Sequence, residues 1–186
     1  MSKYTIGIFI GSLRKDSYSR SVANYFVANA PHDVEFKIVE INQLSMYNQD
    51  LDDTPPVEWV TFRKNVNALD GLLFVTPEHN RSFPAALKNA LDVASRPYGA
   101  SVWNGKPGGI ISVSPGALGG FGANHHLRQV LTFLNVPTLQ QPEAYVGNVM
   151  ASLDTNGVVA DDNLKGFLKQ YQDALVKWVS AINAGK

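Results

Sequence analysis

The residues best suited to chemistry in this chain gather in the stretch Gly11-Ser12-Leu13-Arg14-Lys15-Asp16-Ser17-Tyr18-Ser19. The stretch joins an apolar run to a helical pattern, so it predicts a strand followed by a helix N-terminus. Free backbone amides and the helix dipole favour an anion there, and hydroxyl and guanidinium groups add donors for phosphate oxygens. A serine-rich helix cap without a ligand has a similar composition, and remains the alternative for this loop alone. The candidate ligands are Ser12, Arg14, Ser17 and Ser19.

Two later loops carry groups suited to a flat ligand. Residues 76–84 place a compact polar segment, Glu78-His79-Asn80-Arg81-Ser82-Phe83, between two prolines. Its amides and the Asn80 side chain can hydrogen-bond the edge of a planar heterocycle, while His79 and Phe83 can pack on the ring. Residues 114–122 are rich in glycine, which allows close approach of backbone to a ring but equally suits a flexible connection.

Short apolar runs alternate with longer helical patterns, which is typical of βαβ units in a parallel sheet. The runs predict strands over 4–10, 34–41, 71–76, 108–114 and 138–146, the last interrupted by Pro142. The helical patterns cover 19–30, 56–68, 84–95, 124–134 and 163–184. We expect one domain over residues 1–186, an α/β, flavodoxin-like three-layer sandwich whose five-stranded parallel sheet has the order 2-1-3-4-5. In that order the three loops above are neighbours at the carboxyl edge of the sheet.

Composition excludes several functions. The 186 residues carry 16 basic and 16 acidic side chains and no cysteine. A net charge of zero argues against nucleic acid or an anionic membrane as a partner, and redox chemistry would need a cofactor because there is no thiol. The start of the chain lacks the apolar stretch of a signal peptide, so we expect a soluble cytoplasmic protein. His125 and His126 diverge by about 100° on a helix, and we expect no metal site.

One phosphate loop and two ring loops together indicate a mononucleotide site, and FMN fits better than a dinucleotide. The Gly-x-Gly-x-x-Gly spacing is missing after the first strand. Gly105-Lys106 is followed by proline, so it is not a P-loop. The segment 42–56 is long and polar enough to reach over such a site.

The same residues resemble the NADPH-dependent FMN reductase family, and within it the bacterial chromate and quinone reductase branch. The phosphate loop, the segment Pro77-Glu78-His79-Asn80 with Leu87-Lys88-Asn89-Ala90, and a third segment from Gly105 to Gln129 match its signatures in order. His79 stands where that family usually has tyrosine. The similarity extends over most of the chain, except the last helix.

The resemblance implies an enzyme that transfers two electrons from NADPH or NADH, through FMN, to small acceptors such as quinones, free flavin, chromate or other metal oxyanions. It implies ping-pong turnover, with hydride chemistry carried by FMN and no catalytic side chain. The FMN phosphate would lie on Ser12, Arg14, Ser17 and Ser19, and the ring against Pro77, Glu78, His79, Asn80, Ser114 and Gly116.

Two further expectations complete this interpretation. Arg81 is the candidate for attracting an anionic donor or acceptor, although a solvated loop charge is the alternative. The resemblance also implies a homodimer or homotetramer, for which Trp59, Trp103 and Trp178 would supply surface aromatics. The alternative function is a flavodoxin-like FMN electron carrier between protein partners. Such carriers are usually strongly acidic, whereas this chain is neutral.

Overall fold

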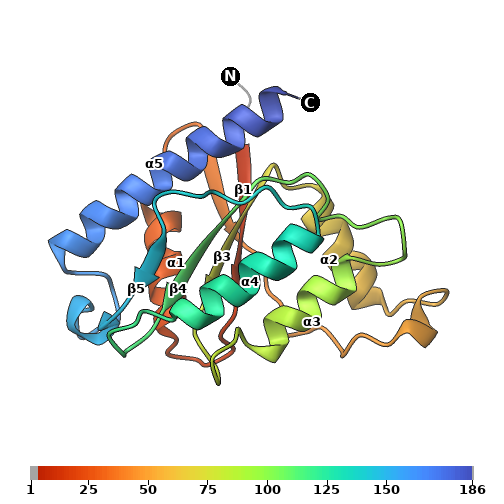
Figure 1. Cartoon of the computed structure of the whole chain (residues 1–186), viewed down its shortest axis with the longest axis horizontal. Coiled ribbons are helices and arrows are strands. Elements are labelled where there is room, and N and C mark those ends of the chain that lie inside the picture. Colours follow the sequence, from red (N-terminus) through yellow and green to blue (C-terminus); the bar gives the residue numbers. More distant parts are fainter. Residues whose placement is uncertain (1–3, 186) are drawn as a thin grey trace.

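The computed structural model describes residues 4–185 and has a five-stranded parallel sheet of order β2-β1-β3-β4-β5 (Figure 1). The strands are β1 Tyr4–Ile10, β2 Val34–Ile38, β3 Gly71–Thr76, β4 Gly108–Val113 and β5 Ala144–Val146. This confirms the predicted fold class and strand order. Strand β1 lies between β2 and β3, so that Ile8 lies opposite Ile38 on one side and Leu73 on the other.

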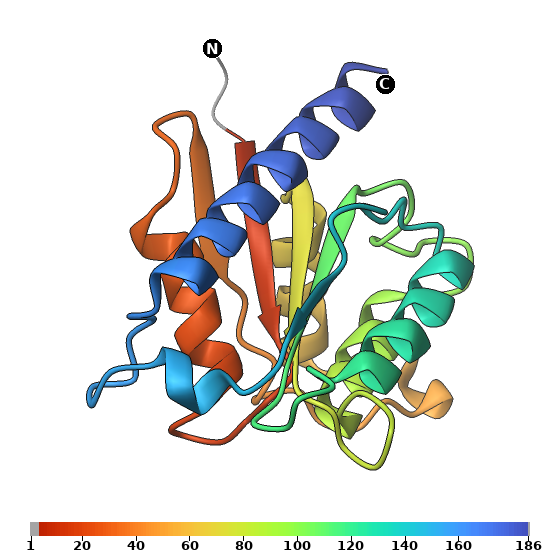
Figure 2. The same cartoon turned by 60° about the vertical axis from the view of Figure 1, so that its left-hand side comes forward.

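Helices cover both faces of the sheet (Figure 2). They are α1 Tyr18–Ala28, α2 Val57–Asn67, α3 Ala85–Ala94, α4 Phe121–Phe133 and α5 Asp162–Ala184, with short 3-10 helices η1 Gln49–Leu51 and η2 Val149–Ser152. Successive strand residues point to opposite faces. Ile8 accordingly packs with side chains of α1 and α5, whereas Phe9 packs with α2, α3 and α4. The sheet therefore separates two apolar cores.

Several predicted boundaries were wrong by a few residues. The second strand ends at Ile38, because Val39 and Ile41 leave the strand to pack with α2 and α3. The fifth strand is reduced to Ala144–Val146, since Pro142 has no N–H for the ladder, although Leu139 still donates to the carbonyl of Gly108. Helix α4 begins at Phe121 rather than 124, directly after the glycines.

The prediction that the tryptophans supply surface aromatics was wrong for two of the three. Trp59, on α2, and Trp103, after α3, are completely buried in the core beneath these helices. Trp103 lies edge-on to Phe9, with the ring centroids 5.3 Å apart, and its indole N–H donates to the carbonyl of Leu91. Both tryptophans therefore belong to the core. No helix among residues 4–185 is long and apolar enough to cross a bilayer.

Candidate functional site

The loops after β1 and β3 and the start of the loop after β4 meet at the carboxyl edge of the sheet, around a cavity of about 760 Å³. This is where ligands bind in open parallel sheets. The structure thus brings together most of the residues singled out in the sequence, although Asn80, Arg81, Ser114 and Gly116 do not line the cavity. The lining residues from the predicted set are Ser12, Arg14, Ser17, Ser19, Pro77, Glu78 and His79; further lining residues are Gly11, Leu13, Tyr18, Pro84, Ala85, Ala86, Val113 and Pro115.

The first end of this cavity is rich in hydrogen-bond donors. Ser17 is the N-cap of α1, and its hydroxyl accepts from the amide of Arg20 at 3.4 Å. The helix starts one residue earlier than the sequence predicted because Ser17 is the cap. The backbone amides of Tyr18 and Ser19, next in the helix, have no backbone acceptor among the described residues. Such free amides at a helix N-terminus bind anions.

Arg14 adds a cation to the same end. Its guanidinium lies over the ring of Tyr18, 4.6 Å from the centroid, and its side chain is exposed. The hydroxyl of Ser12 accepts from the amide of Arg14 at 3.3 Å, which holds the loop backbone in a turn. Arg14 forms no ion pair within residues 4–185, so its charge is available to a ligand.

The opposite end is built by a tight turn after β3. His79 and Ser82 exchange two backbone hydrogen bonds, of 2.8 and 3.0 Å. The two residues between them, Asn80 and Arg81, have φ angles of 51° and 67°. Positive φ at both central positions is the geometry of a type I′ turn, which is strained for a residue such as arginine. The turn directs His79 to the cavity and leaves Asn80 and Arg81 exposed outside it.

Glu78 has a role that sequence reasoning missed. One carboxylate oxygen accepts from the backbone amide of Ala123 at 3.1 Å, in the first turn of α4, and the other pairs with Arg81 at 3.2 Å. Negative charge at a helix N-terminus is stabilising. The carboxylate therefore ties the loop after β3 to the helix that follows the glycine loop. The spacing to Ala123 gives no sequence signal, because 45 residues separate the two groups.

The glycine loop after β4 packs closely against the backbone of β5. Gly119 and Gly120 have positive φ, as predicted for close backbone approach, and a Cβ on Gly119 would lie 2.6 Å from the carbonyl carbon of Tyr145. The hydroxyl of Ser114 accepts from the amide of Gly116 at 3.1 Å, which forms the turn that carries Pro115 to the cavity. Ser114 and Gly116 thus shape the loop, and Val113 and Pro115 are the residues that line the cavity.

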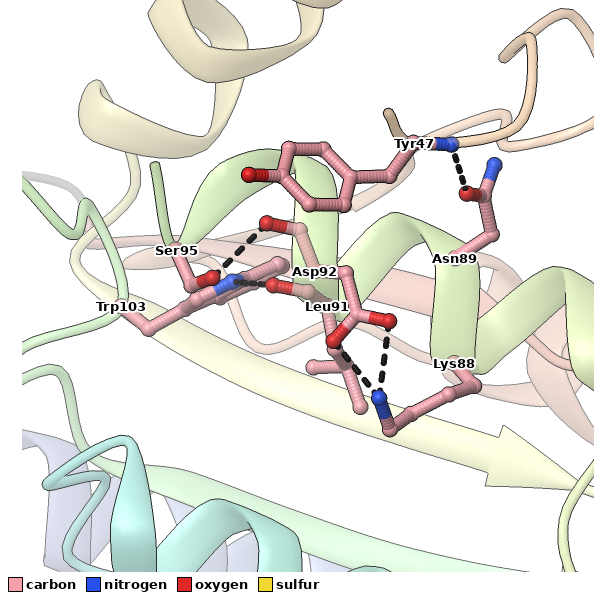
Figure 3. A network of polar contacts seen from close by, with 7 residues as sticks. All are labelled: Tyr47, Lys88, Asn89, Leu91, Asp92, Ser95 and Trp103. Carbon is pink, nitrogen blue, oxygen red and sulfur yellow. Dashed lines mark hydrogen bonds and ion pairs between the residues drawn. The ribbon is translucent and has the colours of Figure 1, made fainter. Parts of the chain in front are cut away.

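Helix α3 forms one border of the cavity and also holds the long segment 42–56. Asn89 of α3 accepts from the amide of Tyr47 at 2.8 Å (Figure 3), and it donates to the carbonyl of Ser45. The C-terminal end of α3 is fixed by Trp103 and Ser95, whose side chains donate to the carbonyls of Leu91 and Asp92. No residue of 42–56 lines the 760 Å³ cavity, so the prediction that this segment reaches over the site was wrong.

The two adjacent histidines of α4 have different partners. His125 contacts the hydroxyl of Tyr145 at 2.8 Å, and His126 contacts the hydroxyl of Ser82 at 2.8 Å. Burial and the neighbouring Glu143 carboxylate raise the pKa of Tyr145 to about 12. The histidines brace the loops beside the cavity. Within the described part of the chain, no three His, Asp or Glu side chains are grouped closely enough to hold a metal ion.

FMN fits this arrangement. The cavity has a hydroxyl- and cation-rich end for a phosphate and an opposite end of proline and backbone for a flat ring. A parallel sheet of order 2-1-3-4-5 with a ligand cavity at its carboxyl edge defines a flavodoxin-like fold, in which flavodoxin binds FMN at this edge. The sequence model of the NADPH-dependent FMN reductases matches residues 4–151, and the chain belongs to this family. The family confirms the enzyme class and the cofactor expected from the sequence.

Similar proteins agree with this assignment. A quinone reductase of Pseudomonas putida is 50% identical over 177 residues, which is 95% of each chain. A 2-hydroxy-1,4-benzoquinone reductase of a Burkholderia species is 42% identical over 94% of this chain and 95% of that protein. The solved structure of the flavoenzyme FerB, an NAD(P)H:(acceptor) oxidoreductase of Paracoccus denitrificans, is 34% identical with a TM-score of 0.90, over 96% of this chain and 98% of that chain.

Proposed function

We propose that this protein is an NAD(P)H-dependent quinone reductase that uses FMN to pass two electrons to small acceptors. The main support for this proposal is the 760 Å³ cavity, which has an end suited to a phosphate and an end suited to a flat ring and opens to solvent beside exposed His79. The relatives named as quinone reductases support quinones as the acceptor class. We include free flavin, chromate and other metal oxyanions among the acceptors.

We propose that Ser12, Arg14, Ser17 and Ser19 hold the FMN phosphate and that Pro77, Glu78, His79, Asn80, Ser114 and Gly116 form or support the ring end. FMN, when bound, supplies the hydride and electron chemistry. The protein contributes position, because a donor held against the ring needs no further orientation. Donor and acceptor would occupy the same open place in turn, which gives ping-pong kinetics. Backbone amides of the two ring loops would stabilise negative charge at the ring edge.

Arg81 is our candidate for attracting anionic donors or acceptors. Its side chain is 78% exposed, and its ion pair with Glu78 holds it near the turn beside the cavity. We expect Arg81→Ala to raise the KM for NADPH and chromate about threefold and to leave the KM for a neutral quinone unchanged. Equal Michaelis constants for all substrates would remove this role.

The test of the proposed function is a visible spectrum followed by anaerobic reduction. The purified protein should be yellow, and NADPH or NADH should bleach the flavin band rapidly without a stable one-electron signal. A quinone should restore the band. A yellow protein that nicotinamide nucleotides do not reduce would favour the electron carrier, and a protein that rejects added FMN would overturn the cofactor assignment.

We further propose a single domain over residues 1–186 that works in the cytoplasm, where NAD(P)H is available, as a homodimer or homotetramer. Two aromatic side chains support self-association: Phe133 at the end of α4 is 89% exposed and Tyr98 is 92% exposed. Exposed aromatics are enriched at protein interfaces. Sedimentation should give a mass of two or four chains, and Phe133→Ser should shift it towards the monomer.

A further inference from the structure

A second cavity, of about 460 Å³, lies beside the phosphate loop. One wall is the start of α1, and the other is formed by residues 150–157, in the connection that leaves β5 and passes the loop between β1 and α1 (Figure 2). Ser17 and Tyr18 line both this cavity and the larger one. The two cavities therefore adjoin at Ser17, which we assign to the FMN phosphate, and at Tyr18.

The lining of this second cavity combines amide and hydroxyl groups with apolar ones. The polar side chains are Ser21, Asn24, Thr155 and Asn156, and the apolar ones are Met150 and Leu153. Met150 is 61% exposed, so its thioether is accessible to a ligand in this cavity. The thioether of Met150 and the side chain of Leu153 can pack against a flat base. The amide and hydroxyl groups can form hydrogen bonds with the edge of that base and with a sugar. The mixture suits a nucleoside.

The charges around the cavity suit a phosphate next to a ribose. Lys15 is exposed and forms no ion pair within residues 4–185, whereas Arg20 is engaged with Glu40 through two contacts of 3.2 Å. Asp16 and Asp154 also line the cavity. One free cation beside two carboxylates does not suit a ligand that carries only negative charge. It does suit a nucleotide, because the two carboxylates can accept hydrogen bonds from ribose hydroxyls while Lys15 attracts a phosphate.

The wall formed by residues 153–159 is held in shape by its own hydrogen bonds. Leu153 and Val159 form an antiparallel bridge, and the amide of Asp154 donates to the carbonyl of Val158 at 2.9 Å. The carboxylate of Asp154 accepts from the amides of Asn156 and Val158, at 2.8 Å each. Preformed pockets lose little entropy when a ligand binds.

We propose that this second cavity, here called the adenylate cavity, binds the adenosine half of NAD(P)H, with Lys15 beside its phosphates. The nicotinamide half then lies in the larger cavity, and the pyrophosphate crosses near Tyr18. The inference rests on the proposed function, because it assigns a place to part of its electron donor. It also assigns a binding role to α1 and the connection after β5, which lie outside the three loops of the FMN site.

The test compares full and truncated donors. Asn24→Phe fills the cavity from an exposed position, and Lys15→Glu reverses the free charge. We expect each to raise the KM for NADPH and NADH about five- to tenfold and to leave reduced nicotinamide mononucleotide, which lacks the adenylate, within about twofold. Lys64→Glu, an equal charge change on α2 across the sheet, is the matched control and should leave all donors unchanged. A larger effect of Lys15→Glu on NADPH than on NADH would place Lys15 beside the 2′-phosphate rather than the pyrophosphate.

A binding measurement separates this inference from the proposed function. ADP-ribose, which carries no nicotinamide, should bind the FMN-loaded protein in calorimetry, and Asn24→Phe should weaken it about tenfold while the affinity for FMN is unchanged. Equal KM values for full and truncated donors, or ADP-ribose binding that both variants leave intact, would overturn the adenylate cavity while the reductase stands. Absence of flavin reduction by any donor would instead overturn the proposed function.

Discussion

The two ends of the FMN cavity are built in different ways. At the ring end, Glu78 joins the loop after β3 to the start of α4, the His79–Ser82 pair closes that loop, and Gly119 lies close to the backbone of Tyr145. At the phosphate end, the loop after β1 makes few internal bonds and presents free amides and Arg14. The ring end is held by bonds within the protein, so we expect substitutions there to change stability. The phosphate end is completed by the ligand, so we expect substitutions there to change FMN affinity.

The largest expected effect is at the ring end. Gly119→Ala places a Cβ 2.6 Å from the carbonyl carbon of Tyr145 and keeps a positive φ. Together, steric overlap and the left-handed backbone should lower the free energy of unfolding by about 3–4 kcal/mol. Denaturant unfolding measures this. The control is Gly105→Ala, which has a φ of 72° but no atom within 4 Å of the added Cβ, and should cost only about 1–2 kcal/mol. Equal losses would show that the loop accommodates the contact.

At the phosphate end, Ser17→Asp should separate affinity from stability. Aspartate is also a good N-cap, so the free energy of unfolding without FMN should change by less than about 0.5 kcal/mol. Its charge repels the phosphate, and FMN affinity should fall about 100-fold, which is about 2.7 kcal/mol. Fluorescence titration of FMN gives the affinity. Ser17→Ala is the companion variant, with loss of about 1 kcal/mol of stability and a smaller loss of affinity. If Ser17→Asp retains its FMN affinity, the FMN phosphate does not bind at the start of α1.

Glu78→Gln tests the link between the two ring loops. The amide oxygen can still accept from Ala123, but the ion pair with Arg81 and the negative charge at the start of α4 are lost. We expect a loss of about 1 kcal/mol in unfolding free energy and an FMN affinity within about threefold of the original. Glu78→Ala, which removes the acceptor as well, should cost more. If both variants unfold like the original protein, Glu78 does not brace the loops.

The smallest expected effect concerns pH. Burial and Glu143 raise the pKa of Tyr145 to about 12, above its ordinary value near 10, so the folded state holds this proton more tightly than the unfolded chain. Tyr145 therefore contributes stability that is complete below pH 10 and is lost as the pH rises from 10 towards 12. Unfolding midpoints measured from pH 8 to 11 should fall less steeply for Tyr145→Phe. Parallel curves would show that Tyr145 does not anchor the glycine loop through its protonated form.

The sequence predicted the sheet order and seven of the residues that line the 760 Å³ cavity, because hydrophobic period and turn residues are local signals. It did not predict that Glu78 turns to Ala123, since that contact depends on how two distant loops pack. The burial of Trp59 and Trp103 was not predicted either, because a tryptophan in the sequence gives no signal that separates a core position from an interface position. The fifth strand was overestimated because alternation continued past Pro142.

The bonds that Asn89 makes with residues 45 and 47 have a practical consequence for engineering. Asp53 and Thr54 form an exposed stretch that lines neither cavity, and it follows Asp52, whose carboxylate accepts from the hydroxyl of Tyr47 at 3.2 Å. Extra length at an exposed loop tip costs little, because closure entropy grows slowly with loop length. A peptide tag or a small reporter domain inserted between Asp53 and Thr54 would therefore leave the enzyme folded, which gives a handle for surface attachment that spares both termini.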